Sequence, residues 1–365
     1  MHRKPKIAVI GLKGLPAFGG TAAVGEQLIE QLKSQFDFTV LATGSHASAD
    51  YQPEGYRQIV FSNRGKGGLN TFLYYWKCLF HCWFHRYDLV HIHHAASGYI
   101  TPLLRLKYKV VTTFHGIHIS DDPKFSRRQN RFFRFSQRMH LKYANEVVSV
   151  SKPDQETICE KYGQAIHYIP NGITLQALQP EMSAENAAPY LFFAAGRIYE
   201  IKGLHLLLQA AHEINLQLPI RVAGDTAQVK AYAERLGELQ QGLPVSYLGL
   251  IRDKGELMRL VAEASLFIFP SLTEAMSMML LEVVSMQTPV IASDIPANQA
   301  ILQTDEVLFF KSGNAVDLAA KISYALEHPQ EMKIRAAKAY ATLQKDFTWD
   351  RISAQYAALY QSLLD

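Results

Sequence analysis

The chain has 365 residues, about twice the usual size of one domain, so two domains are expected. Hydrophobic residues make up 48% and charged residues 19%, a balance typical of a soluble globular enzyme. No apolar run approaches the roughly 18 to 20 residues that a membrane-spanning helix needs. No leader-like hydrophobic segment opens the chain, and the 3 cysteines have neither zinc spacing nor an even count. We therefore expect a cytoplasmic protein without a disulfide framework.

Charge is distributed unevenly along the chain. Residues 1–172 hold 22 Lys and Arg against 12 Asp and Glu, a net charge of +10. Residues 173–365 hold 15 against 21, a net charge of −6, and the whole chain carries +4 at pH 7. A basic front half beside an acidic back half indicates that the front half faces an anionic partner.

Short β-rich runs alternate with helical patterns from end to end, which predicts parallel α/β sheets. In the first half we predict helices at about 22–33, 69–85, 124–143 and 153–161. The strands predicted there are Lys6–Ile10, Phe38–Ala42, Gln58–Phe61, Leu89–His93, Val110–Phe114, Glu146–Val150 and Ile166–Ile169. Those of the second half are Tyr190–Ala194, Ile220–Ala223, Val245–Leu248, Leu266–Phe269, Pro289–Ala292 and Val307–Phe310.

A domain boundary is predicted after the turn tripeptide Pro170, Asn171 and Gly172, because a polar stretch follows it. The expected domains are 1–172 and 173–345, with a C-terminal segment at 346–365. A final helix from Trp349 to Leu364 should place four apolar or aromatic side chains on one face: Tyr356, Leu359, Tyr360 and Leu363.

Three loops that follow predicted strands are candidate ligand-binding segments, because ligands of parallel α/β domains bind beyond the carboxyl ends of strands. The first loop, from Gly11 to Gly20, is rich in glycine, which allows a ligand close to the backbone. Its spacing is not GxGxxG, and no acidic residue closes the unit where a dinucleotide ribose needs one. A dinucleotide fold is therefore disfavoured, and a turn required by the fold is the alternative explanation of the glycines.

The second loop carries Arg197 and Lys202, five residues apart after a predicted strand. Two cations in this position can converge on one diphosphate. Taken alone, they are also what a solvated helix face would carry.

The third loop and its helix carry Glu274 and Glu282, which would lie about 12 Å apart along a continuous helix. We expect Glu274 in the loop and Glu282 in the second or third turn of the helix. One carboxylate could then bind a sugar and the other ribose hydroxyls, while the amides of Ala275–Met278 at the helix start meet phosphate. A glutamate within the apolar run Met276–Val284 is costly to bury without a partner, which favours a functional role.

In order and spacing, these segments together resemble the GT-B fold glycosyltransferases, specifically glycosyltransferase family 4. The resemblance covers nearly the whole chain. It rests on Gly19–Gly20, Thr113–Gly116, Val150–Lys152, Ile169–Ile173, Gly196–Arg197 with Lys202–Gly203, Ala223–Asp225, Leu248–Gly249, Glu274 with Glu282, Thr288–Ser293 and Phe347–Trp349.

The resemblance implies two Rossmann-like, doubly wound parallel-sheet domains facing a central cleft, with a C-terminal helix that crosses back to the first domain. It also implies retaining transfer of a hexose from a UDP- or GDP-sugar, without a metal or other cofactor. In the implied site, Arg197 and Lys202 neutralise the departing diphosphate. Glu274 binds the transferred sugar and Glu282 the ribose. The remaining implied donor contacts are His115, Gly19, Gly20, Gly249, Ile251, Ala275, Met276, Ser277 and Met278.

One departure from the family pattern concerns the sugar. Ala275 and Met276 stand where Gly and Phe are frequent after the first glutamate, and Met276 leaves the identity of the sugar open.

In the implied mechanism, fixed cations stabilise the charge that develops on the leaving diphosphate. Because departing phosphate oxygen can take the acceptor's proton on the same face, we assign Glu274 to positioning and not to nucleophilic attack.

A basic, aromatic and acid-free stretch runs from Lys124 to Lys142. It can lie against an anionic membrane and meet a lipid-linked acceptor. The alternative is an ordinary amphipathic helix with solvated arginines; nucleic acid is disfavoured because no nucleic-acid motif accompanies it. The apolar segment 72–84 could contribute to membrane contact, although a packed core helix explains it more simply. The arginines assigned to this surface are Arg127, Arg128, Arg131 and Arg134.

His91, His93 and His94 suggest a metal site, but no carboxylate or cysteine partner is evident nearby, so a strand-end or site-lining role is preferred.

Within the fold, the alternatives to glycosyl transfer are a sugar-nucleotide epimerase or a phosphorylase. From a different class, a catalytically silent sugar-nucleotide-binding subunit is possible. Surface-polysaccharide assembly is the expected context, with no nucleic-acid partner.

Overall fold

The computed structural model describes residues 3–17, 20–47, 51–62, 67–117, 126–175 and 188–365. It divides into two compact units. Unit 1 comprises Met1–Gly172 together with Trp349–Asp365, and unit 2 comprises Ile173–Thr348. Each unit is built on its own parallel sheet.

The described part of unit 1 holds a seven-stranded sheet in the order β3-β2-β1-β4-β5-β6-β7, with every neighbouring pair parallel. The central strands are almost wholly apolar and buried on both faces, as strands covered by helices on two sides must be. Strand order reverses between β1 and β4. The strands are β1 (Lys6–Ile10), β2 (Asp37–Thr43), β3 (Arg57–Phe61), β4 (Leu89–Ile92), β5 (Lys109–Phe114), β6 (Glu146–Ser149) and β7 (His167–Tyr168).

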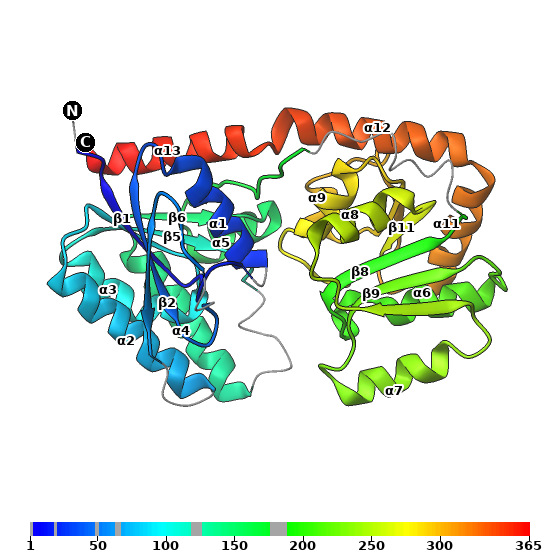
Figure 1. The fold of residues 1–365 in the computed structure, drawn as a ribbon, viewed down its shortest axis with the longest axis horizontal. Coiled ribbons are helices and arrows are strands. Elements are labelled where there is room, and N and C mark those ends of the chain that lie inside the picture. The colour runs from blue at the N-terminus through cyan, green and yellow to red at the C-terminus, as the bar shows by residue number, and fades with distance from the viewer. Residues whose placement is uncertain (1–2, 18–19, 48–50, 63–66, 118–125, 176–187) are drawn as a thin grey trace. The chain divides into compact units, whose positions relative to one another are not determined.

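Helices cover both faces of this sheet. Figure 1 shows α2, α3 and α4 on one side and α1 and α13 on the other, and the residue contacts agree. The helix α4 begins at a capping box, in which Ser126 and Gln129 satisfy each other's backbone amides. The helices are α1 (Gly20–Leu32), α2 (Gly68–Phe84), η1 (Ala95–Ile100), α3 (Thr101–Arg105), α4 (Arg127–Tyr143), α5 (Lys152–Tyr162) and α13 (Trp349–Leu364).

The C-terminal helix α13 packs in unit 1 although it follows unit 2 in the chain. It spans Trp349–Leu364, the bounds predicted for the final helix within the expected segment 346–365. Gly172 allows this packing, because a Cβ atom there would lie 2.5 Å from Cδ2 of Trp349. The expected apolar face is confirmed for Tyr356 and Tyr360, which are fully buried.

In unit 2 the described residues form a six-stranded sheet in the order β10-β9-β8-β11-β12-β13, again parallel throughout. Strand order reverses between β8 and β11. The strands are β8 (Leu191–Arg197), β9 (Ile220–Asp225), β10 (Val245–Gly249), β11 (Leu266–Phe269), β12 (Val290–Ser293) and β13 (Leu308–Phe310).

The helices of unit 2 also form two layers, with α6, α7 and α11 on one face and α8, α9 and α12 on the other (Figure 1). The main core cluster lies between the sheet and the α6–α11 layer. The helices are η5 (Glu200–Lys202), α6 (Leu204–Glu213), α7 (Lys230–Leu239), α8 (Lys254–Glu263), α9 (Met278–Ser285), α10 (Pro296–Gln299), α11 (Ala315–Glu327) and α12 (Pro329–Asp346).

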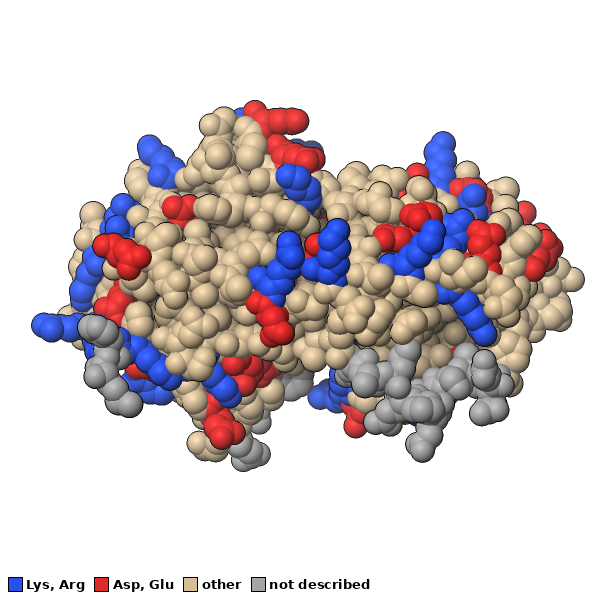
Figure 2. All heavy atoms as spheres, turned by 90° about the horizontal axis from the view of Figure 1, so that it is seen from above, with Lys and Arg blue, Asp and Glu red and all other residues tan. Residues whose placement is uncertain are grey.

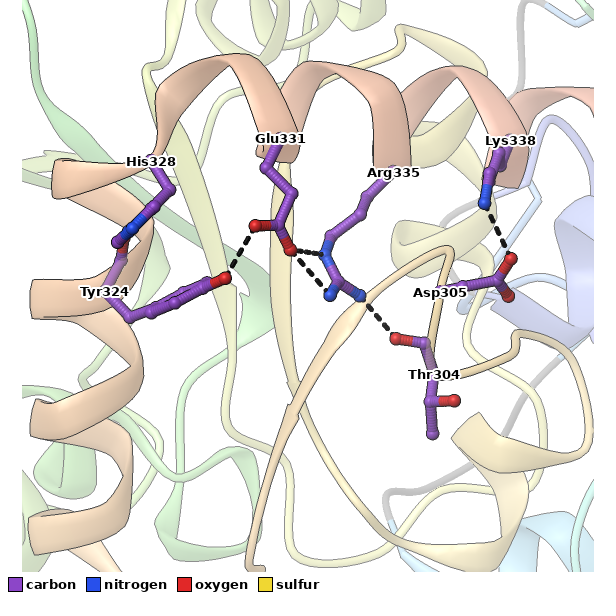
Figure 3. A network of polar contacts seen from close by, with 7 residues as sticks. All are labelled: Thr304, Asp305, Tyr324, His328, Glu331, Arg335 and Lys338. Atoms are coloured by element: carbon purple, nitrogen blue, oxygen red, sulfur yellow. Dashed lines mark hydrogen bonds and ion pairs between the residues drawn. The ribbon is translucent and has the colours of Figure 1, made fainter.

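A polar network holds α12 to α11 and to the loop before β13 (Figure 3). Glu331 accepts from the Tyr324 hydroxyl at 2.6 Å and from Arg335 Nε at 2.9 Å. Arg335 also donates to the Thr304 carbonyl, and Lys338 pairs with Asp305 at 2.9 Å. These contacts fix the long helix that leads toward α13.

The alternating pattern of strands and helices expected from the sequence is confirmed, with ends that differ by a few residues. The interpretation of residues 72–84 as a packed core helix is only half right. Tyr75, Cys78 and Cys82 are buried, but Phe80 and Phe84 on the opposite face are exposed. Within the described residues no helix is both long and apolar enough to cross a membrane.

Candidate active site

The loops that follow β8 and β11 lie side by side at the point where the strand order of unit 2 reverses. This is the position at which open parallel sheets bind ligands. The Leu272 amide donates to the Ile201 carbonyl at 2.8 Å and so ties the second loop to the first. Gly203 has a φ of +72°, and a Cβ atom there would lie 2.0 Å from the Pro270 carbonyl oxygen. Only glycine allows the two backbones to approach this closely.

The close approach brings together two residues that the sequence placed in the site. Lys202 Nζ donates to Glu274 Oε1 at 2.6 Å, and the side chains are 22% and 12% exposed. Arg197 ends β8 at the edge of the same loop and is exposed. Its backbone pairs with Asp225 of β9, but its guanidinium makes no hydrogen bond or ion pair with any residue that the structure describes. Its guanidinium is therefore available to an anionic ligand.

Glu282 lies in the second turn of α9, as expected, and Glu274 in the loop before that helix. Ser277 caps α9, its hydroxyl accepting from the Leu280 amide at 3.5 Å. Met276 and Ser277 are buried, whereas Ala275 and Met278 are half-buried. The first turn of α9 thus follows the Glu274 loop directly, with its amide groups and positive dipole end at that loop.

Glu282 is paired with Lys254, the first residue of α8. The carboxylate is 17% exposed and the lysine 50% exposed, so the pair lies at the surface on the lysine side only. Asp253 caps α8 by accepting from the Glu256 amide at 2.8 Å, which fixes the helix start that carries Lys254. The sequence analysis did not identify Lys254 as the partner of this carboxylate. Lys254 follows an aspartate typical of a helix start, and that was its only sequence signal.

The strand β10 ends close to this helix start in the sequence. Gly249 has a φ of +69° and ends β10, and Ile251 is half-buried in the loop that leads to α8. A Cβ atom at Gly249 would meet nothing within 4 Å, so the positive φ rather than crowding accounts for glycine at this position.

In unit 1, three histidines gather where β4 and β5 end. His93 Nδ1 lies 3.1 Å from His115 Nε2, and their rings stack with centroids 5.4 Å apart. The rings of His91 and His93 are 3.9 Å apart. Gly11, after β1, approaches this group so closely that a Cβ atom there would lie 2.9 Å from His94 Cβ. The preferred strand-end placement of these histidines is thus what the structure shows.

Helix α13 holds the histidine group from the far end of the chain. The Tyr360 hydroxyl is hydrogen-bonded to His91 Nδ1 at 2.7 Å. The Thr113 hydroxyl is hydrogen-bonded to His91 Nε2 at 2.8 Å. Tyr356 bonds the same threonine at 3.2 Å. Burial lowers the pKa of His91 to about 3 and that of His93 well below its usual value. Burial also lowers the pKa of His115, so the group is neutral at pH 7.

No group of three or more His, Cys, Asp or Glu side chains within the described residues is arranged to hold a metal ion.

Family models match both halves of the chain. The model described as Glycosyltransferase Family 4 matches residues 18–177, and the model described as Glycosyl transferases group 1 matches residues 189–328. Both parallel-sheet units are thereby covered. The chain is a GT-B glycosyltransferase.

Relatives of this glycosyltransferase span most of its length. It is 23% identical over 350 residues to the UDP-Gal:alpha-D-GlcNAc-diphosphoundecaprenol alpha-1,3-galactosyltransferase of Escherichia coli, covering 87% of this chain and 86% of the relative. It is 24% identical to the O-antigen chain mannosyltransferase B of Escherichia coli, covering 75% and 74%.

Solved structures share the fold. The sucrose-phosphate synthase of Thermosynechococcus elongatus superposes with a TM-score of 0.82 at 21% identity, over 99% of both chains. Anabaena HepE in complex with UDP and glucose superposes with a TM-score of 0.79 at 19% identity, over 98% of this chain and 100% of that one. The expected GT-B architecture of two parallel-sheet α/β domains is confirmed.

The glycosyltransferase brings some of the expected site residues together and leaves others apart. Lys202 and Glu274 form an ion pair, whereas the side chains of Arg197 and Glu282 make no hydrogen bond or ion pair with either. Gly20 is the exposed first residue of α1, and Gly19 lies outside the described residues. The arginines of α4 are all exposed on that helix: Arg127, Arg128, Arg131 and Arg134.

Proposed function

We propose that this glycosyltransferase moves a hexose, with retention of anomeric configuration and without a metal, from a UDP- or GDP-sugar to a glycan or lipid-linked acceptor. Surface-polysaccharide biosynthesis is the proposed context. The names of the two Escherichia coli relatives, which specify a diphosphoundecaprenol-linked acceptor and an O-antigen chain, support this context. The solved complex of HepE with UDP and glucose supports a nucleotide-sugar donor.

The observation that carries the proposal is the ion pair of Lys202 and Glu274, in the loops at the strand-order reversal of unit 2 that also begin with the exposed Arg197. A nucleotide diphosphate brings at least two negative charges, which a lysine and an arginine can neutralise. A carboxylate held by that lysine can accept hydrogen bonds from sugar hydroxyls. An epimerase or phosphorylase has less use for this combination of paired cations and carboxylates.

In the proposed reaction, the bond between the anomeric carbon and the diphosphate oxygen breaks, and its electron pair leaves with the nucleotide diphosphate. Lys202 and Arg197 stabilise that charge as it develops. The acceptor hydroxyl forms the new bond on the face that the diphosphate leaves, and its proton passes to a phosphate oxygen. Retention follows from attack on that face, and no protein base is needed.

The other donor contacts are proposed by their position. Glu282 would exchange Lys254 for ribose hydroxyls, and the loop of Gly249 and Ile251 would lie against the base. The amides between Ala275 and Met278 would meet phosphate at the start of α9. His115 is proposed to contact the transferred sugar as a neutral imidazole, with Gly19 and Gly20 near the diphosphate or acceptor.

On the acceptor side, we propose that the exposed arginines of α4 attract an anionic, lipid-linked acceptor to the inner face of a membrane. The helix α4 contains no acidic residue, so its arginines form a row of like charge. Electrostatic attraction to anionic headgroups then raises the local concentration of the acceptor.

A nucleotide-release assay over a panel of UDP- and GDP-sugars tests the proposal. Each donor is incubated with and without a membrane lipid extract, and in the presence of EDTA. We expect release from one donor that rises with the extract, persists in EDTA and is lost in Glu282→Ala and Lys202→Ala. Donor conversion to an epimer without release would favour an epimerase. Donor binding without turnover, restored by a second protein, would favour a silent subunit.

A further inference from the structure

The helix α2 presents an apolar stripe to the solvent. Its inner face is buried in the core of unit 1, yet six large apolar side chains lie on its outer face, spaced three, four or seven residues apart along one side of the helix. The exposures at the two ends of the stripe are 72% for Leu69 and 83% for Phe84. The members of this α2 stripe are Leu69, Phe72, Leu73, Phe80, Trp83 and Phe84.

The stripe continues onto the residue that follows α3. Leu106 is 76% exposed, and its neighbour Lys107 donates from Nζ to the Trp83 carbonyl at 2.6 Å. Tyr108 donates to the His85 carbonyl at 2.6 Å. These contacts place Leu106 at the end of α2 that carries Trp83 and Phe84, and they enlarge the apolar surface there. A contiguous exposed apolar surface of this kind marks an interaction site.

The α2 stripe lies in the same layer as the basic helix α4. Phe72 stacks on Tyr99 of η1 with ring centroids 4.8 Å apart, and Tyr99 packs against Phe132 of α4 at 5.8 Å. Helices α2, α3 and α4 occupy one side of the sheet (Figure 1). Aromatic contacts therefore connect the apolar stripe to α4, the helix that carries the arginines.

No acidic residue occurs in α2, η1, α3 or α4. The exposed cations of this layer and its ends are Lys77, Arg86, Arg105, Lys107, Arg127, Arg128, Arg131, Arg134, Arg138 and Lys142. By contrast, the face that Figure 2 shows, viewed from the α12–α13 side, carries acidic and basic side chains interspersed. The layer that exposes the apolar stripe thus carries cations without acidic residues in its helices, unlike the mixed face of Figure 2.

We propose that the α2 stripe inserts into the interface of an anionic lipid bilayer while the arginines of α4 contact the headgroups. Aromatic and aliphatic side chains flanked by cations are what an interfacial helix needs, because burial of the apolar face and attraction to anionic lipid add together. A second copy of this chain is a poorer occupant, since two such layers face to face would oppose like charges. The inference deepens the proposed function by naming the surface on which a lipid-linked acceptor would be met.

Vesicle flotation of the full chain, without donor or acceptor, tests this inference separately from glycosyl transfer. Vesicles of phosphatidylcholine alone are compared with an equal mixture of phosphatidylcholine and phosphatidylglycerol. We expect binding to the mixed vesicles and little to phosphatidylcholine. The double variant Trp83→Ser with Phe84→Ser should bind about tenfold more weakly, because two inserted aromatic side chains are lost. The double variant Arg131→Glu with Arg134→Glu should bind the mixed vesicles more weakly than the parent does. Its slight binding to phosphatidylcholine vesicles should not change.

The matched control is Val316→Ser with Ile334→Ser, which removes two apolar side chains of similar exposure, 64% and 60%, from unit 2. This control should float like the parent. Circular dichroism melts check that all variants are folded, and both substituted aromatic positions are at the surface. Equal flotation of the α2 variant and the parent would overturn the inference. A parent that self-associates without lipid and does not float would also overturn it, and would identify a second copy as the occupant.

Discussion

Lys202 and Glu274 are 72 residues apart in the chain, yet Lys202 Nζ lies 2.6 Å from Glu274 Oε1. The contact joins the loops that follow two adjacent strands, β8 and β11, at the reversal of strand order in unit 2. It holds an ammonium group and a carboxylate together where a parallel sheet binds its ligand. The proposed chemistry depends on this pair more than on any other contact.

Replacing Lys202 with alanine should lower kcat by about a hundredfold to a thousandfold, the usual effect of removing one fixed group that stabilises developing charge. Donor affinity should fall less than kcat, because the lysine acts mainly on the charge of the departing diphosphate. Steady-state kinetics with saturating acceptor measure both parameters. If the variant kept the parental kcat, Lys202 would not stabilise the charge that develops in the reaction.

Glu282→Ala should weaken donor binding by about 1.5 to 3 kcal/mol, the range for hydrogen bonds to a charged group. Lys254→Ala should leave donor binding within about threefold of the parent, because an ion pair to a half-exposed lysine contributes at most about 1 kcal/mol. Calorimetric titration with the nucleotide diphosphate compares the two. Loss of binding in Lys254→Ala as large as in Glu282→Ala would show that the lysine itself holds the ligand.

Gly203→Ala should reduce the unfolding free energy by more than about 1 kcal/mol, because alanine is strained at a φ of +72° and its Cβ meets the Pro270 carbonyl oxygen. Gly163→Ala is a matched control, with a φ of +63° and nothing within 4 Å of a Cβ atom. The control should show only the backbone strain. Denaturant melts measure both, and equal losses would mean that the close approach at Gly203 is not tight in solution.

The buried histidine group should make the glycosyltransferase sensitive to acid. His91 is 1% exposed, and burial lowers its pKa to about 3, whereas an unfolded histidine titrates near pH 6.5. Between those values the unfolded state binds more protons, so stability is complete above pH 6.5 and falls as the pH decreases. His91 alone should cost about 2 kcal/mol between pH 7.5 and 5.

Melting temperatures recorded from pH 7.5 to 5 test this dependence. His91→Gln keeps hydrogen-bonding groups for Thr113 and Tyr360 but does not titrate, so its melting temperature should decline less steeply. A parent whose melting temperature is constant over this range would contradict the burial of neutral histidines.

The sequence predicted the layered architecture because its periodicity is local: buried parallel strands are short apolar runs, and the helices between them alternate with those runs. It also predicted Glu274 in a loop and Glu282 on a helix. It could not predict that Lys254 pairs with Glu282, because a strand separates their helices in the chain.

Two further features depend on tertiary packing. Tyr360 and His91 are 269 residues apart, and no local pattern links them. The sequence of α2 is apolar on both faces, which predicts a core helix. Only the packing of this helix shows that Phe80 and Phe84 remain exposed.

The most direct test follows the sugar itself. The donor identified by nucleotide release, labelled in its sugar, is incubated with the full chain and a membrane lipid extract, and the label in the organic phase is measured. The account predicts transfer of label to lipid by the parent and its loss in Lys202→Ala. Label that stays in the aqueous phase with the parent, whatever lipid is supplied, would contradict glycosyl transfer to a lipid-linked acceptor.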